Sequence, residues 1–237
     1  MRCIVTAGPT FEPLDKVRRL TNFSTGRLGT ELARFLEGRG HEVTLLLGEQ
    51  ATFRDATGPE AMVSTSPSPQ PSPLRTGRGS VTPQIFTTTS DLAERLRRLA
   101  AQEVKAVFHA AAVSDFSFGK VWTRSAEGEL KEVKSGKFST RQGTLLAEFV
   151  PTAKIISELR KWCPTARLIG WKYEVDGTRE DVIREAQKQL ATCLTDACVA
   201  NGPAYGDGYA LVRSGWELKH LADRAALFEE LEKFISA

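Results

Sequence analysis

The polar side chains best placed to do chemistry follow the first apolar run of the chain. Residues 3–5 are predicted to form a buried strand that a turn at Gly8-Pro9 ends, and the loop beyond it carries Arg18 and Asn22. This loop closes with Ser24-Thr25-Gly26 and leads into a predicted helix. The first-turn N–H groups of a helix have no partner within it, and the helix dipole favours an anion there. The spacing therefore predicts either a phosphate site or an ordinary first loop of an α/β fold.

The standard motifs of several enzyme classes do not occur in the sequence. Neither G-x-G-x-x-G nor G-x-x-x-x-G-K-[ST] is present, which weighs against a dehydrogenase. No serine–histidine triad is indicated. The four cysteines have no metal-ligand spacing, so we expect reduced thiols and no metal site built by the protein; they are Cys3, Cys163, Cys193 and Cys198.

A second group of polar residues follows the apolar run at residues 106–112. Asp115 comes just after this run, and the carboxyl end of a central strand is where α/β proteins bind ligands. The alternative role for Asp115 is to cap the next turn. His109 lies inside the run, where we expect a packed core residue. Residues 117–143 are basic and rich in glycine, which predicts a mobile loop or ribbon, either a phosphate lid or solvated surface.

Strands and helices alternate along the chain. Apolar runs predict strands at residues 3–5, 41–48, 84–88, 106–112, 144–150, 167–171 and 197–200. Helices are predicted at residues 31–39, at 91–102 with Ser90 as the N-cap, from Pro151-Thr152 onward, and at 179–193. A hairpin at 209–212 and 216–218 and a helix at 222–235 follow. This pattern predicts an α/β fold with a Rossmann-like, doubly wound, mostly parallel sheet and a small hairpin or flap extension.

Composition limits the class of protein. The 32 basic residues nearly balance the 29 acidic ones, which argues against a nucleic-acid binder. No apolar run is long enough to cross a membrane, and the chain opens directly into a strand, so we expect a cytoplasmic protein. Residues 54–83 are dense in proline and serine and predict a flexible insertion. We therefore expect a single domain, residues 1–237, interrupted by this insertion.

Three separated stretches together resemble one protein family. They are TAGPTFEPLDKVRRLTNFSTGRLG at residues 6–29, AAAVSDF at 110–116, and GWKYEVD through VAN at 170–201. The chain resembles phosphopantothenoylcysteine synthetase, also called phosphopantothenate–cysteine ligase, in a form without the flavin-dependent decarboxylase domain. The resemblance implies that a nucleoside triphosphate activates the carboxylate of 4′-phosphopantothenate as an acyl-nucleotide, and that the amine of cysteine then forms the amide.

The resemblance also implies roles for individual residues. Asn22 would be catalytic, stabilising the acyl-nucleotide, and Arg18 would hold the anionic groups of the substrate. The nucleotide would contact Gly8, Ser24, Gly26, Ala111, Asp115, Lys134 on a flap, and Trp171, which replaces a more usual phenylalanine. The expected co-substrate is ATP or CTP with Mg²⁺, no flavin is expected, and family members are typically homodimers.

Three positions depart from the family pattern. Glu132, Gln189 and Cys193 stand where many bacterial members carry lysines. These differences put triphosphate affinity or nucleotide preference in question, although NFSTGR, AAAVSDF and KYEVD resemble the ATP-using branch. They leave open an alternative function, in which the chain is a catalytically degenerate, nucleotide-binding or regulatory module.

Overall fold

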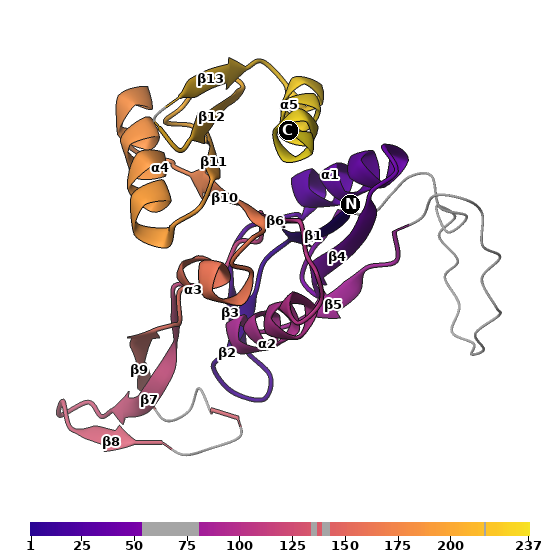
Figure 1. Cartoon of the computed structure of the whole chain (residues 1–237). Helices are drawn as coiled ribbons and strands as arrows, with labels where there is room; N and C mark the ends of the chain where they lie inside the picture. Colours follow the sequence, from indigo (N-terminus) through magenta and orange to yellow (C-terminus); the bar gives the residue numbers. More distant parts are fainter. Residues whose placement is uncertain (54–80, 134–136, 139–142, 216) are drawn as a thin grey trace, which may run out of the picture.

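The computed structural model describes residues 1–53, 81–133, 137–138, 143–215 and 217–237. Its centre is an eight-stranded sheet (Figure 1). From one edge to the other, the strands are β13 (Leu218–Leu221), β12 (Tyr209–Arg213), β11 (Ala197–Asn201), β10 (Arg167–Tyr173), β6 (Ala106–His109), β1 (Arg2–Ala7), β4 (Glu42–Gly48) and β5 (Gln84–Phe86). The six strands from β11 to β5 in this order are parallel to one another. Strand β12 runs antiparallel to both of its neighbours, β11 and β13. The predicted α/β class with a mostly parallel sheet is confirmed.

Helices cover both faces of this sheet (Figure 1). Helices α1 (Arg27–Gly38) and α5 (Arg224–Ser236) pack on one face, where Val5 of β1 lies in a cluster with Leu32 and Leu36. The other face carries α2 (Thr89–Ala100), α3 (Ile155–Trp162) and α4 (Arg179–Cys193). Ile4 points to that side, because successive side chains of a strand alternate between faces. Both faces of β1 are therefore buried, as its continuous apolar run requires.

Two small antiparallel sheets extend from this body. Strands β2 (Phe11–Pro13) and β3 (Arg19–Thr21) form a hairpin in the loop after β1. Strands β7 (Phe116–Arg124), β8 (Leu130–Glu132) and β9 (Thr144–Pro151) form an arm that projects away from the main sheet in Figure 1. Of the two forms predicted for residues 117–143, a ribbon is therefore the one observed in the described part.

Several predicted boundaries are wrong. The polar loop after β1 contains the β2–β3 hairpin, which its sequence did not indicate. The N-cap of α2 is Thr88, whose side chain accepts from the N–H of Asp91, so this helix begins one residue before the expected cap at Ser90. Strand β6 ends at His109 instead of residue 112. Strand β9 extends through Pro151, so α3 begins at Ile155.

Two further expectations concern the insertion and the membrane. Residues 54–80 of the predicted insertion lie outside the described residues, so the insertion remains a prediction. In the ranges that the structure covers, no helix combines the length and the apolar character needed to cross a bilayer.

Candidate functional site

The largest cavity at the carboxyl edge of the parallel strands has a volume of about 630 Å³. It lies where the loops after β1 and β6 meet the ends of β10 and β11. Its lining comprises Gly8, Asn22, Phe23, Ser24, Thr25, Gly26, Arg27, Leu28, Gly29, Ala110, Ala111, Ala112, Val113, Asp115, Trp171, Tyr173 and Asn201. We refer to it as the first cavity. Of the nine residues predicted to be functional, the structure brings seven together here, all except Arg18 and Lys134.

The N-terminus of α1 forms one wall of the first cavity. Its N-cap, Gly26, adopts φ 76°, no side chain caps the helix, and no acidic residue lies in the first turn. A Cβ atom at Gly26 would lie 3.0 Å from Cβ of Ala51 and 3.1 Å from Cδ1 of Leu47, so glycine is required by both space and conformation. The first turn of the helix carries no carboxylate of its own, so its dipole and N–H groups at the cavity suit an anion.

Asn22 ties two loops together beside this helix. Its Nδ2 donates to the carbonyl oxygens of Ala112 and Val113, each at 3.2 Å. The neighbouring Thr21 hydroxyl donates to the carbonyl of Thr10 at 2.9 Å. The backbone around Asn22 is thus held, and its carboxamide lies against the loop after β6.

Arg18 lies outside the lining of the first cavity. Its guanidinium pairs with Asp15 at 2.9 Å and donates to the carbonyl of Phe138 at 3.3 and 3.2 Å. Burial alone would raise the pKa of the Asp15 carboxyl, but N–H groups of Val17, Phe138 and Arg18 donate to it, and the net pKa is lowered. In this conformation Arg18 therefore organises its own loop. Lys134 lies outside the described residues.

A second cavity of about 430 Å³ adjoins the first. The two share Ala111, Val113, Asp115 and Trp171. Among the described residues, Asp115 is the only acidic residue in the lining of either cavity, and Lys154 is a cationic residue of the second. Asp115 and Trp171 thus stand at the boundary between two compartments of one site.

His109 lines the second cavity, although it is also a buried residue of β6. Its Nδ1 lies 3.0 Å from the hydroxyl of Thr6, which accepts from the N–H of Ala111 at 3.1 Å. Burial lowers the pKa of His109 to about 4, so the imidazole is neutral near pH 7. This environment agrees with the packed role predicted for His109.

The three departures from the family pattern lie in different places. Gln189 of α4 is buried, lines the second cavity, and donates from Nε2 to Sγ of Cys198 at 3.2 Å. Gly170 makes room for it, because a Cβ there would lie 2.1 Å from that nitrogen. Cys193 is buried with its Sγ 3.5 Å from Oγ of Ser157 and lines neither cavity. Glu132 ends β8 on the arm.

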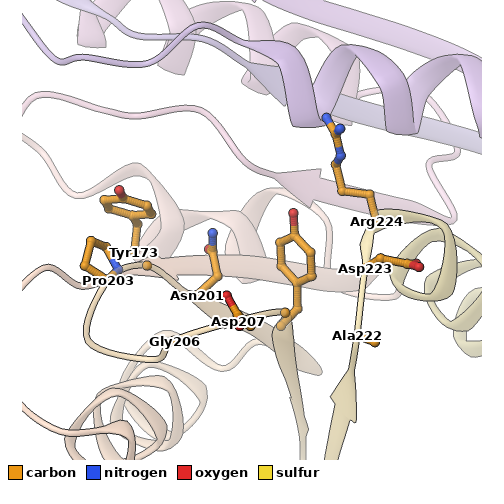
Figure 2. A pocket seen from close by; sticks show the side chains of 11 residues that line it. Tyr173, Asn201, Pro203, Gly206, Asp207, Ala222, Asp223 and Arg224 are labelled. Carbon is orange, nitrogen blue, oxygen red and sulfur yellow. The ribbon is translucent and has the colours of Figure 1, made fainter.

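A third cavity, of about 580 Å³, continues from the first past Tyr173 and Asn201 (Figure 2). Arg224 points from it toward α1 in Figure 2 and pairs with Glu31 at 2.7 Å. Asp223 accepts from the N–H of Ala226 at 2.8 Å and so caps α5. These two charged groups stabilise the packing of α5 and the adjacent helix, so we assign this cavity no part in the chemistry.

Sequence reasoning assigned no role to several lining residues. Phe23, Lys154, Tyr173 and Asn201 were not singled out as functional. The position of Asn201 directly after a predicted parallel strand was the signal that could have identified it. Lys154 and Phe23 carried no such signal. Among the described residues, no group of three or more His, Cys, Asp or Glu side chains is arranged to hold a metal ion.

The fold and the paired cavities define an α/β protein whose ligand site lies at the carboxyl ends of its parallel strands. Residues 1–67 match the family model of the DNA/pantothenate metabolism flavoprotein C-terminal domain. The coenzyme A biosynthesis bifunctional protein CoaBC of Thermococcus kodakarensis is 32% identical over 202 residues, which cover 84% of this chain and 41% of that protein. The chain thus spans less than half the length of this curated relative.

Two solved structures show the same fold. The DNA/pantothenate metabolism flavoprotein of Streptococcus pneumoniae superimposes with a TM-score of 0.76 at 26% identity, over 100% of this chain and 98% of that one. The H337A mutant of Cab2 in complex with phosphopantothenate-cysteine gives 0.69 at 18% identity, over 99% and 85%. The chain belongs to the family of the DNA/pantothenate metabolism flavoprotein C-terminal domain, the phosphopantothenoylcysteine synthetase part of CoaBC, and the family resemblance is confirmed.

Proposed function

We propose that this chain is a phosphopantothenate–cysteine ligase that works in the cytoplasm. It condenses 4′-phosphopantothenate with cysteine through an acyl-nucleotide and releases pyrophosphate. The observation that carries the proposal is the first cavity, which collects Asn22, Ser24 and Gly26 from one motif, Ala111 and Asp115 from a second, and Trp171 from a third. The related Cab2 structure is a complex with phosphopantothenate-cysteine, the product of such a reaction.

The two joined cavities suggest how the nucleotide is divided between them. The phosphates lie at the N-terminus of α1, where Ser24 and Gly26 line the first cavity beside the first turn of the helix. The base lies toward Ala111, Asp115 and Trp171, which also line the second cavity. Mg²⁺ is expected to arrive bound to the triphosphate, because it prefers substrate phosphates and water as ligands. Bound Mg²⁺ would neutralise phosphate charge.

The reaction needs positioning and charge stabilisation more than a protein nucleophile. An oxygen of the pantothenate carboxylate attacks the α-phosphorus, and pyrophosphate leaves. The amine of cysteine then attacks the acyl carbon, the nucleoside monophosphate leaves, and the amine loses a proton. A neutral carboxamide can donate to the oxyanion that forms in this second step. For Asn22 to do so, one of its N–H groups must pass from the carbonyl of Ala112 or Val113 to the substrate.

Arg18 is the residue proposed to hold an anionic group of the substrate. Its present partners, the Asp15 carboxylate and the Phe138 carbonyl, must then be exchanged or shared when the substrate binds. The side chain of Arg18 is 40% exposed, so an anion can reach it without unfolding the loop. Lys134, expected on a flap over the triphosphate, completes the proposed nucleotide contacts.

The test is a ligation assay with 4′-phosphopantothenate and cysteine, in which ATP and CTP are compared and pyrophosphate and amide are both measured. The proposal predicts formation of the amide with at least one of the two nucleotides. Absence of amide with both, in a protein whose melting temperature either nucleotide raises, would refute it.

The departures from the family pattern support a second candidate, a nucleotide-binding or regulatory module without ligase activity. Gln189 brings no positive charge to the second cavity, and its amide is already bonded to Cys198. The same assay separates the two candidates, because this module would bind nucleotide and form no product under any combination of substrates.

The proposed ligase is a homodimer. The family resemblance implies this, and the arm carries apolar side chains that a second copy could cover: Phe116, Phe149 and Val150 are 46%, 53% and 40% exposed.

A further inference from the structure

Phe23 is a fully exposed aromatic side chain at the mouth of the first cavity. Its relative exposure is 111%, the highest among the exposed large apolar residues of the described chain. It nevertheless contributes to the cavity lining, between Asn22 and Ser24. A phenyl ring in water next to a ligand site gains apolar burial only when something occupies that site.

The backbone that carries Phe23 is fastened on both sides. The side chains of Thr21 and Asn22 donate to backbone carbonyls of neighbouring loops. The N–H of Ser24 donates to the carbonyl of Asn22 at 2.9 Å, and the N–H of Phe53 donates to the carbonyl of Thr25 at 3.0 Å. The main chain is therefore fixed, whereas the exposed ring can change rotamer on a picosecond-to-nanosecond timescale. A change of rotamer would move the ring relative to the cavity mouth without any movement of the loop.

The proposed reaction needs such a cover. Its intermediate is a mixed anhydride, and water competes with the amine of cysteine for the acyl carbon. Attack by water breaks the bond between the acyl carbon and the phosphate oxygen, returns the acid and a nucleoside monophosphate, and wastes one triphosphate. Exclusion of water from a reactive intermediate is a recognised task of side chains that close an active site.

We propose that Phe23 folds over the bound acyl-nucleotide and protects it from hydrolysis until cysteine attacks. This inference rests on the proposed ligase function. Phe23 is a positioning residue: it takes no proton and forms no bond. Its measurable property is the coupling ratio, defined as pyrophosphate released per amide formed, which is about one when the intermediate is fully protected.

A competing explanation is that the exposed ring contacts another protein. Two more apolar side chains of the same loop are exposed, Val17 at 61% and Leu20 at 37%, and neither lines the first cavity. If the loop serves as a protein contact, truncation of Val17 should act like truncation of Phe23. If Phe23 covers the ligand, the two variants should differ. Val17→Ala is therefore the matched control.

The experiment compares wild type, Phe23→Ala, Phe23→Leu and Val17→Ala for coupling ratio, KM and oligomeric state. We expect Phe23→Ala to raise the coupling ratio and to lower the rate of amide formation about tenfold, since it loses most of the apolar cover. Phe23→Leu should restore most of the coupling, and Val17→Ala should behave as wild type. The melting temperatures should agree, because a fully exposed ring makes little contribution to folding.

Two results would overturn the inference. One is a coupling ratio in Phe23→Ala equal to that of wild type. The other is a parallel change in oligomeric state and coupling in both Phe23→Ala and Val17→Ala, which would assign the loop to a protein contact. Failure of the proposed function would be recognised in a different measurement, because wild type itself would then release no pyrophosphate and form no amide. The inference about Phe23 would then be refuted as well.

Discussion

At the residue scale, hydrogen bonds across the carboxyl edge of the sheet determine what each polar side chain can do. Thr6 bonds to His109 and to the N–H of Ala111, and Asn22 bonds to the two carbonyls that follow. The first set positions an imidazole that burial keeps neutral, and the second holds a carboxamide beside the cavity. Both sets join residues about 90 or more positions apart.

The neutral state of His109 predicts acid-dependent stability. Its pKa is about 4 in the folded protein and about 6.5 when unfolded. Because the unfolded state binds this proton more readily, the free energy of unfolding should fall as the pH drops from 6.5 toward 4. Between pH 7 and pH 5 the contribution of this group should fall by about 2 kcal/mol. Urea unfolding at both pH values measures it, and His109→Gln, which cannot be protonated, should lose this part of the dependence. An equal dependence in that variant would contradict the assignment.

Asn22→Asp should abolish most of the ligase turnover. The change replaces a donor by a carboxylate that faces the carbonyls of Ala112 and Val113 and the oxyanion of the substrate. We expect kcat to fall roughly 100- to 1,000-fold, as for the loss of one oxyanion donor. The matched control is Gln102→Glu, the same chemical change at a residue outside the cavities, where the side-chain oxygen accepts from Arg2. Near-normal turnover of Asn22→Asp would remove the catalytic role.

At the element scale, the close approach of α1 to β1 aims the helix N-terminus at the first cavity. A Cβ atom on Gly29 would lie 2.6 Å from Cβ of Ala7 and 3.1 Å from the carbonyl oxygen of Thr6. Only glycine lets the first turn of the helix lie this near the strand. At the other end of α1, a Cβ on Gly38 would have nothing within 4 Å.

This contrast predicts opposite effects of one substitution within one helix. Gly29→Ala should lower the free energy of unfolding by about 1–3 kcal/mol, because the helix must move away from the strand. Gly38→Ala should raise it by up to about 1 kcal/mol, since alanine favours the helix. Chemical denaturation of both variants tests the pair. Gly29→Ala should also weaken nucleotide binding, and a variant with unchanged stability would show that the approach is not close.

At the scale of the whole molecule, the stretch predicted as an insertion lies in the sequence between two strands that pair at one edge of the main sheet. Strand β4 precedes residues 54–83 and β5 follows them, and the two pair in parallel through Leu46 and Gln84, Leu47 and Ile85, and Gly48 and Phe86. The arm formed by β7, β8 and β9 extends from the body that this sheet forms (Figure 1).

Replacement of residues 57–80 by a short Gly-Ser linker should leave the fold and the ligase activity intact. The strands on either side keep their pairing, and the entropy of loop closure depends only weakly on loop length, so the free energy of unfolding should change by no more than about 1 kcal/mol. Urea unfolding and the ligation assay measure the two properties. Lost activity in a stably folded deletion variant would assign this stretch a function.

The proposed homodimer predicts a specific loss of association. Phe149 packs edge-to-face with Phe116 and at a tilt against Phe118, at centroid distances of 6.2 and 5.2 Å, while remaining half exposed. Phe149→Ser should convert dimers to monomers in analytical ultracentrifugation, because it removes apolar area from the surface proposed to be shared. Leu194→Ser, which alters an exposed apolar residue outside the arm, should not. A wild-type monomer at all concentrations would refute the proposal.

Much of the fold was predictable because buried positions are apolar and their spacing in the sequence differs between strands and helices. The continuous apolar runs around Val5, Phe108 and Val199 indicated parallel strands covered on both faces. Helix α4 was predicted with its observed bounds, Arg179–Cys193, because its apolar positions recur at helical spacing. The predicted boundaries are wrong where a second residue nearby could serve the same purpose or where the residue tolerates another structure. Thr88 caps α2 in place of Ser90, and Pro151, expected to start a helix, ends strand β9 of the arm.

The sequence by itself determined the strands of the main sheet and the helices that cover it, the family, and the residues that gather around the first helix N-terminus. Only the tertiary structure decided that Arg18 pairs with Asp15, that Asn22 bonds to the loop after β6, and that Phe23 stands exposed over a cavity. The physical reason is that a sequence pattern reports whether each segment is buried, whereas the partner of a polar side chain depends on which distant loops the sheet brings together.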